Sequence, residues 1–504
     1  MGITSTFVKN YSRYIHRKVT HDKNNAEQDQ LKTLLNLVDK AKNTSFGKKF
    51  QFSKIKNHND FIDCVPISDY ESFSEYIKQI QEGHFNITWP GKPLYFAKTS
   101  GTTSGAKYIP ISKQSIHNHI DTARNSMFNY IFTQRKFDLL AGKMIFLSGS
   151  PELSKTANIL TGRLSGIINH HIPFYLKKNQ LPCWTTNCLE NWEEKLDNIV
   201  SETIQEDMRV ICGIPPWMIM YFEKLKQKTN KPISEIFPNL SLIIHGGVNY
   251  QPYKKLLDDL LGKPIDMLET FPASEGFFAF QSDINDSSLL LNTNSGIYFE
   301  FIPLQHTPHS IKKRLNLSEV ELNKPYILVI SNNAGLWCYN TEDVVKFVSL
   351  KPFKLQVAGR VKHFISAFGE HVIGEEIDKV MSYSLQKVNM NVKEFTVAPF
   401  ITSKDYSNQQ SCHEWYIEFT SQPINLNDIA VEMDLHLQKL NIYYADLRKG
   451  NILNNLRIIP VKENGFSNYM KAIGKLGGQN KLPRLSNDRF IADFLISNNL
   501  IYEN

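Results

Sequence analysis

A segment rich in hydroxyl groups and glycines has the composition of a phosphate-binding loop. Residues 98–107 read Lys-Thr-Ser-Gly-Thr-Thr-Ser-Gly-Ala-Lys and follow a short apolar stretch at 94–97. Glycines permit unusual backbone dihedral angles, and successive exposed N–H groups can bind an anion. The segment is not a Walker A loop, because Gly105 is followed by Ala-Lys rather than by Lys-Ser or Lys-Thr. A flexible surface turn is the alternative interpretation.

Three further motifs follow runs that we predict to be strands. Glu275, within the segment 270–276, could hold Mg²⁺, which prefers carboxylate and phosphate oxygens. The paired glycines Gly246 and Gly247 would let a flat base lie against the backbone. Asp343 could accept hydrogen bonds from two vicinal ribose hydroxyls. Each motif taken alone is more often an ordinary turn or loop.

Two segments in the last third of the chain complete the set. Residues 357–370 read Val-Ala-Gly-Arg-Val-Lys-His-Phe-Ile-Ser-Ala-Phe-Gly-Glu, and residues 479–484 read Gln-Asn-Lys-Leu-Pro-Arg. The Gly359-Arg360 pair precedes a stretch of α+β character. We therefore predict a domain boundary there, with an N-terminal domain at 1–358 and a C-terminal lid domain at 359–504.

The pattern around these motifs predicts the elements that position them. Residues 26–42 place Leu31, Leu34, Leu35 and Val38 on one helical face, and the α-rich start continues to about residue 89. From about residue 94 to 305, short apolar runs alternate with turns and helical stretches, which predicts a largely parallel, buried sheet. The runs lie at 143–147, 209–212, 240–244 and 265–268. Polar residues just past such strands lie at the carboxyl edge, where open α/β sheets bind ligands.

A different pattern follows. Apolar runs at 289–291 and 297–302 flank a turn at 294–296, and the runs at 326–331 and 344–350 are also β-like. We expect an antiparallel β region here. The predicted fold is α/β, with a large N-terminal α/β domain that carries a β-rich subdomain, and a small C-terminal α+β domain joined by a hinge.

Composition excludes several classes of protein. The chain has 504 residues, 41% of them apolar and 21% charged, the balance of a soluble globular protein. The net charge of +7 is spread along the chain, whereas a nucleic-acid-binding protein concentrates basic residues in a patch. The six cysteines show neither zinc spacing nor the density of a disulfide scaffold, which favours the cytoplasm. No apolar run approaches the ~20 residues that span a bilayer, and we see no signal peptide.

In their order and spacing, the six segments together resemble the adenylate-forming superfamily of acyl-CoA synthetases, luciferases and peptide-synthetase adenylation domains. More narrowly, they resemble the auxin-responsive Gretchen Hagen family of acyl-acid amido synthetases. Residues 99–105 match that family's phosphate loop, and 271–276 resemble its Tyr-Ala-Ser-Ser-Glu motif. Residues 339–344 resemble Tyr-Arg-x-Gly-Asp-Val, and 479–484 resemble Gln-Tyr-Lys-x-Pro-Arg. The resemblance covers about residues 90 to 490.

The resemblance implies an enzyme that uses ATP and Mg²⁺ to convert a small carboxylic acid into its acyl-adenylate, and then transfers the acyl group to an amino acid. Glu275 would hold the magnesium, Lys362 would lie at the hinge, and Lys481 would be delivered by the C-terminal domain to neutralise charge during adenylation. Arg124 could meet the acyl carboxylate, with a solvated helix arginine as the alternative. The residues implied to contact the nucleotide are Ser100, Thr102, Thr103, Gly246, Gly247, Ser274, Asp343 and Arg360.

The chain departs from the family pattern at three positions. Asn340 and Glu342 stand where the family usually has Arg and Gly, so we expect a different turn there. His371 stands where plant members carry a lysine after the hinge, which leaves one phosphate contact open.

Two other functions remain as alternatives. One is an acyl-CoA ligase that shares the adenylate intermediate, and the other is a non-catalytic nucleotide-binding protein. We expect a cytoplasmic monomer whose partners are ATP, the acid and the amino acid, with no nucleic-acid or membrane partner.

Overall fold

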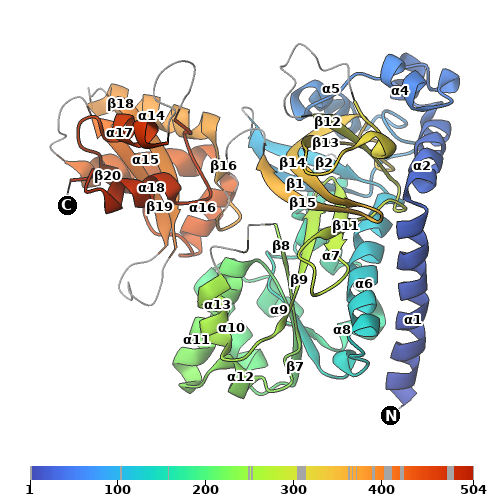
Figure 1. Cartoon of the computed structure of the whole chain (residues 1–504), viewed down its shortest axis with the longest axis horizontal. Coiled ribbons are helices and arrows are strands. Elements are labelled where there is room, and N and C mark those ends of the chain that lie inside the picture. Colours follow the sequence, from blue (N-terminus) through green and yellow to red (C-terminus); the bar gives the residue numbers. More distant parts are fainter. Residues whose placement is uncertain are drawn as a thin grey trace.

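The computed structural model describes residues 3–502 except 103–104, 157, 248–249, 251–253, 304–313, 361–363, 366, 371, 389–391, 402–410, 420–424 and 474–481. A large N-terminal part and a smaller C-terminal part are evident in Figure 1. The chain begins with helices, as predicted. These are α1 (Ile3–Asn24), α2 (Ala26–Ala41), α3 (Ser45–Lys49), α4 (His58–Cys64) and α5 (Tyr70–Gln81).

Helix α2 confirms the prediction for 26–42 but buries a slightly different face. Leu34 and Val38 are buried, whereas Leu31 is 48% exposed. The buried stripe includes Gln30, whose side-chain amide donates to the carbonyls of Thr293 and Ile297. Because these bonds hold Gln30 against the sheet, the helix is rotated so that Leu31 faces solvent. Inclusion of Leu31 in the core face was therefore wrong.

The N-terminal part is built on an eleven-stranded sheet in the order β12-β13-β14-β15-β11-β10-β9-β8-β7-β3-β6. Its first half in the chain is parallel, since β3 pairs with β6 and β7, β7 with β8, and β8 with β9 in that sense. These strands are β3 (Lys143–Phe146), β6 (Gln180–Leu181), β7 (Met208–Cys212), β8 (Leu242–Gly246) and β9 (Asp266–Ala273). All four predicted apolar runs are confirmed as strands. Helices α10 (Trp192–Thr203), α11 (Pro215–Thr229) and α13 (Lys254–Leu261) connect them.

The other half of the sheet is antiparallel, as predicted, and continues from the parallel half through the β9–β10 hairpin. Its strands are β10 (Gly276–Gln281), β11 (Leu289–Leu291), β12 (Ile297–Pro303), β13 (Pro325–Asn332), β14 (Tyr339–Leu350) and β15 (Phe353–Arg360). The turn at 294–296 does not join a hairpin, because β11 pairs with β10 and β15 whereas β12 pairs with β13.

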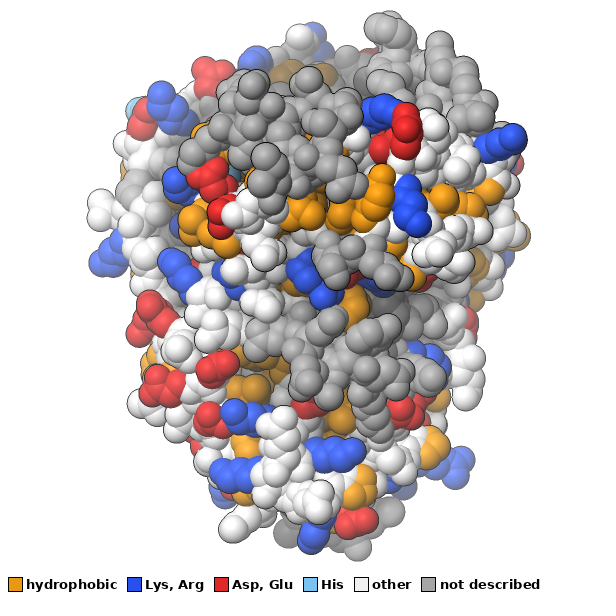
Figure 2. Space-filling view, turned by 90° about the vertical axis from the view of Figure 1, so that its left-hand side faces the viewer, with side chains coloured by type: hydrophobic (Ala, Val, Ile, Leu, Met, Phe, Trp, Pro, Cys, Tyr) orange, Lys and Arg blue, Asp and Glu red, His pale blue; other side chains and the backbone are white. Residues whose placement is uncertain are grey.

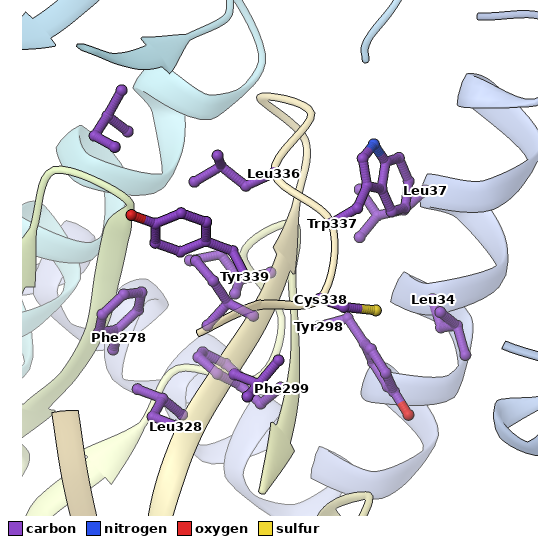
Figure 3. Packing of buried hydrophobic residues seen from close by; sticks show 14 of the residues in the cluster. Leu34, Leu37, Phe278, Tyr298, Phe299, Leu328, Leu336, Trp337, Cys338 and Tyr339 are labelled. Carbon is purple, nitrogen blue, oxygen red and sulfur yellow. The ribbon is translucent and has the colours of Figure 1, made fainter. Parts of the chain in front are cut away.

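Helix α2 packs against this antiparallel half. Figure 3 shows Leu34 and Leu37 of α2 directed toward Trp337 and Tyr298. Trp337 is fully buried, and its indole N–H donates to the carbonyl of Thr88. Large apolar and aromatic side chains therefore fix the start of β14, the strand that carries Asp343.

A second, four-stranded sheet has the order β2-β1-β5-β4. The strands are β1 (Tyr95–Thr102), β2 (Gly105–Ile111), β4 (Ser154–Thr156) and β5 (Ile159–Gly162). The apolar run at 94–97 belongs to this sheet and not to the large one. The predicted phosphate loop thus belongs to an antiparallel hairpin, because Thr99 and Thr102 continue the β pairing of the strand.

The C-terminal part has its own three-stranded sheet, β18-β19-β20, and largely its own apolar core. Its strands are β18 (Val392–Phe400), β19 (Cys412–Phe419) and β20 (Arg457–Pro460). Its helices are α14 (Gly374–Val388), α15 (Leu426–Leu440), α16 (Ile442–Lys449), α17 (Gly465–Ala472) and α18 (Phe490–Ser497). The predicted fold class is confirmed. The predicted boundary falls inside β15 and stays a prediction.

The charged surface and the cysteines can be described directly. On the face of the smaller part that Figure 2 shows, Lys and Arg side chains are interspersed with Asp and Glu side chains. All six cysteines are free thiols. Among the described residues, no helix is both long and apolar enough to cross a membrane.

Candidate active site

The hydroxyl-rich hairpin is anchored at its base. Strand β1 pairs with β2 from Tyr95 to Thr102, with Thr99 opposite Lys107 and Thr102 opposite Gly105. Ser100 and Thr102 belong to β1, but only their backbone is described, and Thr103 lies outside the described residues. The hairpin therefore places the predicted phosphate-binding residues at a strand end, and their contacts with phosphate stay predictions.

The paired glycines lie at the carboxyl end of β8, as predicted. Gly246 is paired with Thr270 of β9, and a Cβ atom on Gly246 would lie 2.3 Å from the Thr270 carbonyl oxygen. Gly247 has φ of 79°, in the left-handed region that favours glycine. The Thr270 hydroxyl donates to the His245 carbonyl at 2.9 Å. Close backbone packing thus requires a glycine at 246 and leaves a stretch without side chains.

His245 supports this strand end as a neutral residue. Its ring is buried and stacks on Tyr250, with 4.6 Å between ring centroids. Burial lowers the pKa of His245 to about 4, because the charged imidazolium is disfavoured away from water. The side chain therefore carries no charge near neutral pH.

Glu275 occupies the turn between β9 and β10. Ala273 and Gly276 pair across this turn, so Ser274 and Glu275 form its tip, and both are half-buried. The side-chain amide of Asn332, at the end of β13, donates to the Glu275 carbonyl at 2.8 Å. A Cβ atom on Gly276 would lie 2.4 Å from Ile297, so the turn is also packed tightly against β12. The Glu275 carboxylate is therefore carried on a short and well-supported turn.

Asp343 and Arg360 face each other across strands β14 and β15. Asp343 is buried within a strand, whereas the sequence placed it just before one, because β14 begins earlier, at Tyr339. Glu342 has φ of 65°, the conformation for which the family's glycine is suited. The Asn340 side chain supports this backbone by accepting from the Glu342 N–H at 2.8 Å. The strand pairing brings two predicted nucleotide residues together.

The remaining predicted residues are not joined to this group by described contacts. Arg124, on α6 (Ser115–Thr133), makes an ion pair with Asp121 at 2.9 Å and donates to Asn125. Its contact with an acyl carboxylate stays a prediction. Lys362, His371 and Lys481 lie outside the described residues, so their roles also stay predictions.

The structure adds residues that the sequence did not single out. Asn332 ends an ordinary strand, and Tyr443 lies on a helix of the C-terminal part. The Tyr443 hydroxyl donates to the carbonyl of Lys98, the first residue of the hydroxyl-rich segment, at 2.5 Å. The Arg163 guanidinium lies 4.7 Å from the Tyr443 ring centroid. No local motif marks these residues, because only the tertiary structure brings positions so distant in the chain together.

The architecture is that of an adenylate-forming enzyme. It combines a half-parallel, half-antiparallel sheet with a hydroxyl-rich hairpin, the turn that carries Glu275 and a separate C-terminal domain. Comparison with known proteins agrees with this class. Models of the GH3 family match the chain over its N-terminal domain at residues 15–180 and 154–266, its central domain at 290–360 and its C-terminal domain at 375–490. The chain belongs to the GH3 family.

Relatives and solved structures support the same class. The chain is 24% identical to the jasmonoyl–L-amino acid synthetase JAR4 of Nicotiana attenuata, over 63% of this chain and 66% of that protein. It is 22% identical to JAR6 of the same plant, over 90% of each chain. The fold matches the acyl acid amido synthetase AtGH3.15 with a TM-score of 0.62 at 15% identity, covering 98% of this chain and 96% of the other.

A 2-hydroxyisobutyryl-CoA ligase shares the fold with a TM-score of 0.58 at 13% identity, covering 94% of this chain and 91% of that one. The predictions of an adenylate-forming ligase and of an acyl-acid amido synthetase family are confirmed.

Proposed function

We propose that this chain activates a small carboxylic acid with ATP and Mg²⁺ as its acyl-adenylate and transfers the acyl group to the amine of an amino acid. A free carboxylate is a poor electrophile because its leaving group would be oxide. In the first step the carboxylate attacks the α-phosphorus of ATP and pyrophosphate leaves. In the second step the amine attacks the acyl carbon and AMP leaves.

The observation that carries this proposal is the grouping of Glu275 and the base of the hydroxyl-rich hairpin. The Asn332 side chain donates to the Glu275 carbonyl, and the carbonyl of the next residue, Asn333, accepts from the hydroxyl of Ser112, which directly follows β2 of the hairpin. A carboxylate and a hydroxyl-rich hairpin suit a magnesium nucleotide, because Mg²⁺ prefers carboxylate and phosphate oxygens. Displacement at phosphorus depends mainly on such positioning and charge neutralisation.

The metal would enter as part of the substrate. Within the described part of the chain, no group of three or more His, Cys, Asp or Glu side chains could hold a metal ion. Mg²⁺ bound at Glu275 would therefore take most of its oxygen ligands from the phosphates and water, as is usual for this ion at nucleotide sites.

The nucleoside would lie along the strand ends. The backbone at Gly246 and Gly247, which carries no side chains, would border the adenine. Asp343 would accept from the ribose hydroxyls, and Arg360 pairs opposite Asp343 in the sheet. Ser100, Thr102, Thr103 and Ser274 would contact the phosphates. Lys481 would add positive charge during adenylation, with Lys362 at the hinge.

The choice of an amine as the acceptor rests on the family. The GH3 relatives are amido synthetases that, by name, form jasmonoyl–amino acid conjugates. The CoA ligase shares the fold alone. The amino acid acceptor, the cytoplasmic location and the monomeric state are parts of this proposal.

Exchange of labelled pyrophosphate into ATP tests the first step without any acceptor. We expect magnesium-dependent exchange when the protein is given pools of small carboxylic acids, including jasmonate-like and aryl-acetate acids. If broad pools give no exchange in a protein that still binds ATP, the adenylation proposal is wrong and the nucleotide-binding alternative is favoured.

A further inference from the structure

Helix α16 of the C-terminal part lies directly on the base of the hydroxyl-rich hairpin. At its first turn, the Tyr443 hydroxyl donates to the Lys98 carbonyl at 2.5 Å. On the next turn, Asp446 forms an ion pair with Arg163. At its end, a Cβ atom on Gly450 would lie 2.9 Å from Trp192 of α10. Both ends of this helix therefore contact the N-terminal part.

The local sequence explains why Tyr443 faces outward. The Asn441 side chain caps α16 by accepting from the Tyr444 N–H at 2.9 Å, and its amide donates to Glu376 at 3.1 Å. Tyr444 is fully buried in its own domain and donates to Asp434. Because adjacent residues of a helix point about 100° apart, anchoring Tyr444 in the core directs Tyr443 toward the neighbouring domain.

The receiving surface is equally well defined. Strand β5 pairs in parallel with β1, and Gly162 is opposite Ala97. Lys98 is the next residue of β1 and Arg163 directly follows β5, so the guanidinium and the carbonyl that contact α16 lie side by side. The docking surface thus belongs to the same sheet as the predicted phosphate-binding residues.

The C-terminal part makes a second contact near the predicted adenine-binding glycines. Gly369 has φ of 91°, and a Cβ atom there would lie 3.5 Å from Ile214. Ile214 also borders Gly247. Glu370 fixes this loop by accepting from the Phe368 N–H at 2.7 Å and by pairing with His413 at 2.8 Å. The docked domain therefore adjoins both predicted nucleotide-binding segments.

The charges at the α16 contact indicate which step this orientation serves. The pKa of Tyr443 is raised to about 12, chiefly by burial; Arg163 opposes this rise, and the carboxylates of Asp446 and Glu275 add to it. Asp446 thus adds a negative charge near the hairpin and engages Arg163. This pairing neutralises the Arg163 guanidinium and keeps it from a triphosphate, which suits the state after pyrophosphate has left.

We propose that Tyr443, assisted by Asp446, is a positioning residue that holds the C-terminal domain in the orientation for amide formation. This inference rests on the proposed two-step function. The Tyr443 hydrogen bond contributes more than the Arg163–Asp446 pair, since both charged side chains of that pair are about a third or more exposed, and exposed ion pairs add little.

Separate measurement of the two half-reactions tests the proposal. In Tyr443→Phe, the single-turnover reaction of preformed acyl-adenylate with the amine should slow about tenfold, the effect of losing one partly buried hydrogen bond. Pyrophosphate exchange should stay within about twofold of wild type. Asp446→Asn should show the same selectivity with a smaller effect, of about twofold to threefold. A matched control is Tyr469→Phe, whose ring packs against Phe494 within the same domain.

A charge swap supplies an independent measurement. Arg163→Asp combined with Asp446→Arg should recover part of the amide-forming rate that either single change loses, with little change in exchange, whereas a purely structural role would affect both half-reactions. Provided that the wild type carries out exchange, two results overturn the proposal. One is an equal loss of rate in both half-reactions, and the other is a loss of exchange rate alone. Absence of exchange in the wild type instead contradicts the proposed function itself.

Discussion

The side-chain amide of Asn332 donates a hydrogen bond to the backbone carbonyl of Glu275 at 2.8 Å. The same side chain accepts from the N–H groups of Ala334 and Leu336 at 3.0 and 3.1 Å. One residue therefore joins the end of β13 to the turn that carries the predicted magnesium ligand. This linkage makes the position of Glu275 depend on a residue outside any recognisable motif.

Asn332→Asp should separate these contacts. The carboxylate can still accept from Ala334 and Leu336, but it cannot donate to the Glu275 carbonyl and would repel it. We expect the maximal exchange rate to fall about tenfold or more, because losing a buried donor leaves its partner unsatisfied. The measurement is pyrophosphate exchange as a function of magnesium concentration, with Asn316→Asp as a control at an exposed cap. A wild-type rate and magnesium dependence in Asn332→Asp would contradict the support role.

Glu275→Gln tests the metal role directly. The substitution keeps the shape of the side chain and removes its charge, so adenylation should fall by about 10²–10³-fold, typical of losing one electrostatic group in a transition state. The solvent-exposed Glu193→Gln should have no effect. Unchanged rate and magnesium dependence in Glu275→Gln would exclude Glu275 as the ligand.

Gly246→Ala and Gly247→Ala should differ in severity. At 246 the new Cβ atom would lie 2.3 Å from a backbone oxygen, so the strands must move, at a cost of about 1–3 kcal/mol. At 247 the methyl group has space, and the left-handed φ costs only about 1 kcal/mol. Urea unfolding measures the stability, and the KM for ATP reports the site. Equal stability of both variants and wild type would show that close packing at Gly246 is unimportant.

Because of the buried His245, the folded protein should lose stability against unfolding in acid. Its pKa in the folded protein is about 4, below the ordinary 6.5, so the unfolded chain binds a proton that the folded chain does not. Stability is therefore full above pH 6.5 and declines as pH falls through 4. The decline attributable to His245 is about 3 kcal/mol in total. Urea unfolding between pH about 7 and about 5 should show a shallower decline in His245→Asn than in wild type. Identical slopes would mean that His245 titrates normally.

Lys481→Ala tests the delivered-lysine prediction from the sequence. Positive charge beside the phosphates is needed as pyrophosphate leaves, whereas amide formation needs space for the amine. We expect acyl-adenylate formation to slow much more than the reaction of preformed acyl-adenylate with amine. Equal loss in both half-reactions, or no loss in either, would indicate a surface lysine.

Much of the large sheet was predictable because its strands are short apolar runs, and the local sequence determines their length and the turns on either side. The paired glycines were placed correctly at a strand end for the same reason. The hairpin at 95–111 was missed as a strand pair, because glycine, serine and threonine in succession have the composition of a loop. The buried position of Asp343 was missed because the three residues before it in β14 are polar and Glu342 has a left-handed φ, so no apolar run marks this part of the strand.

The supporting contacts could not be predicted. Asn332 acts on Glu275, and Tyr443 acts on Lys98, across separations of 57 and 345 residues. Neither contact leaves a periodic or compositional signal, because each depends on one side chain that the folded structure orients. Leu31 shows the same limit on a smaller scale, since two hydrogen bonds of Gln30 decide which helical face is buried.

The identity of the product tests the central claim most directly. Wild-type protein with ATP, Mg²⁺ and an acid that supports exchange should be offered all common amino acids together with CoA, and the products identified by mass. The account predicts an amide with at least one amino acid, formed with one AMP per amide, and no thioester. A thioester with CoA and no amide with any amino acid would contradict it and identify the chain as an acyl-CoA ligase.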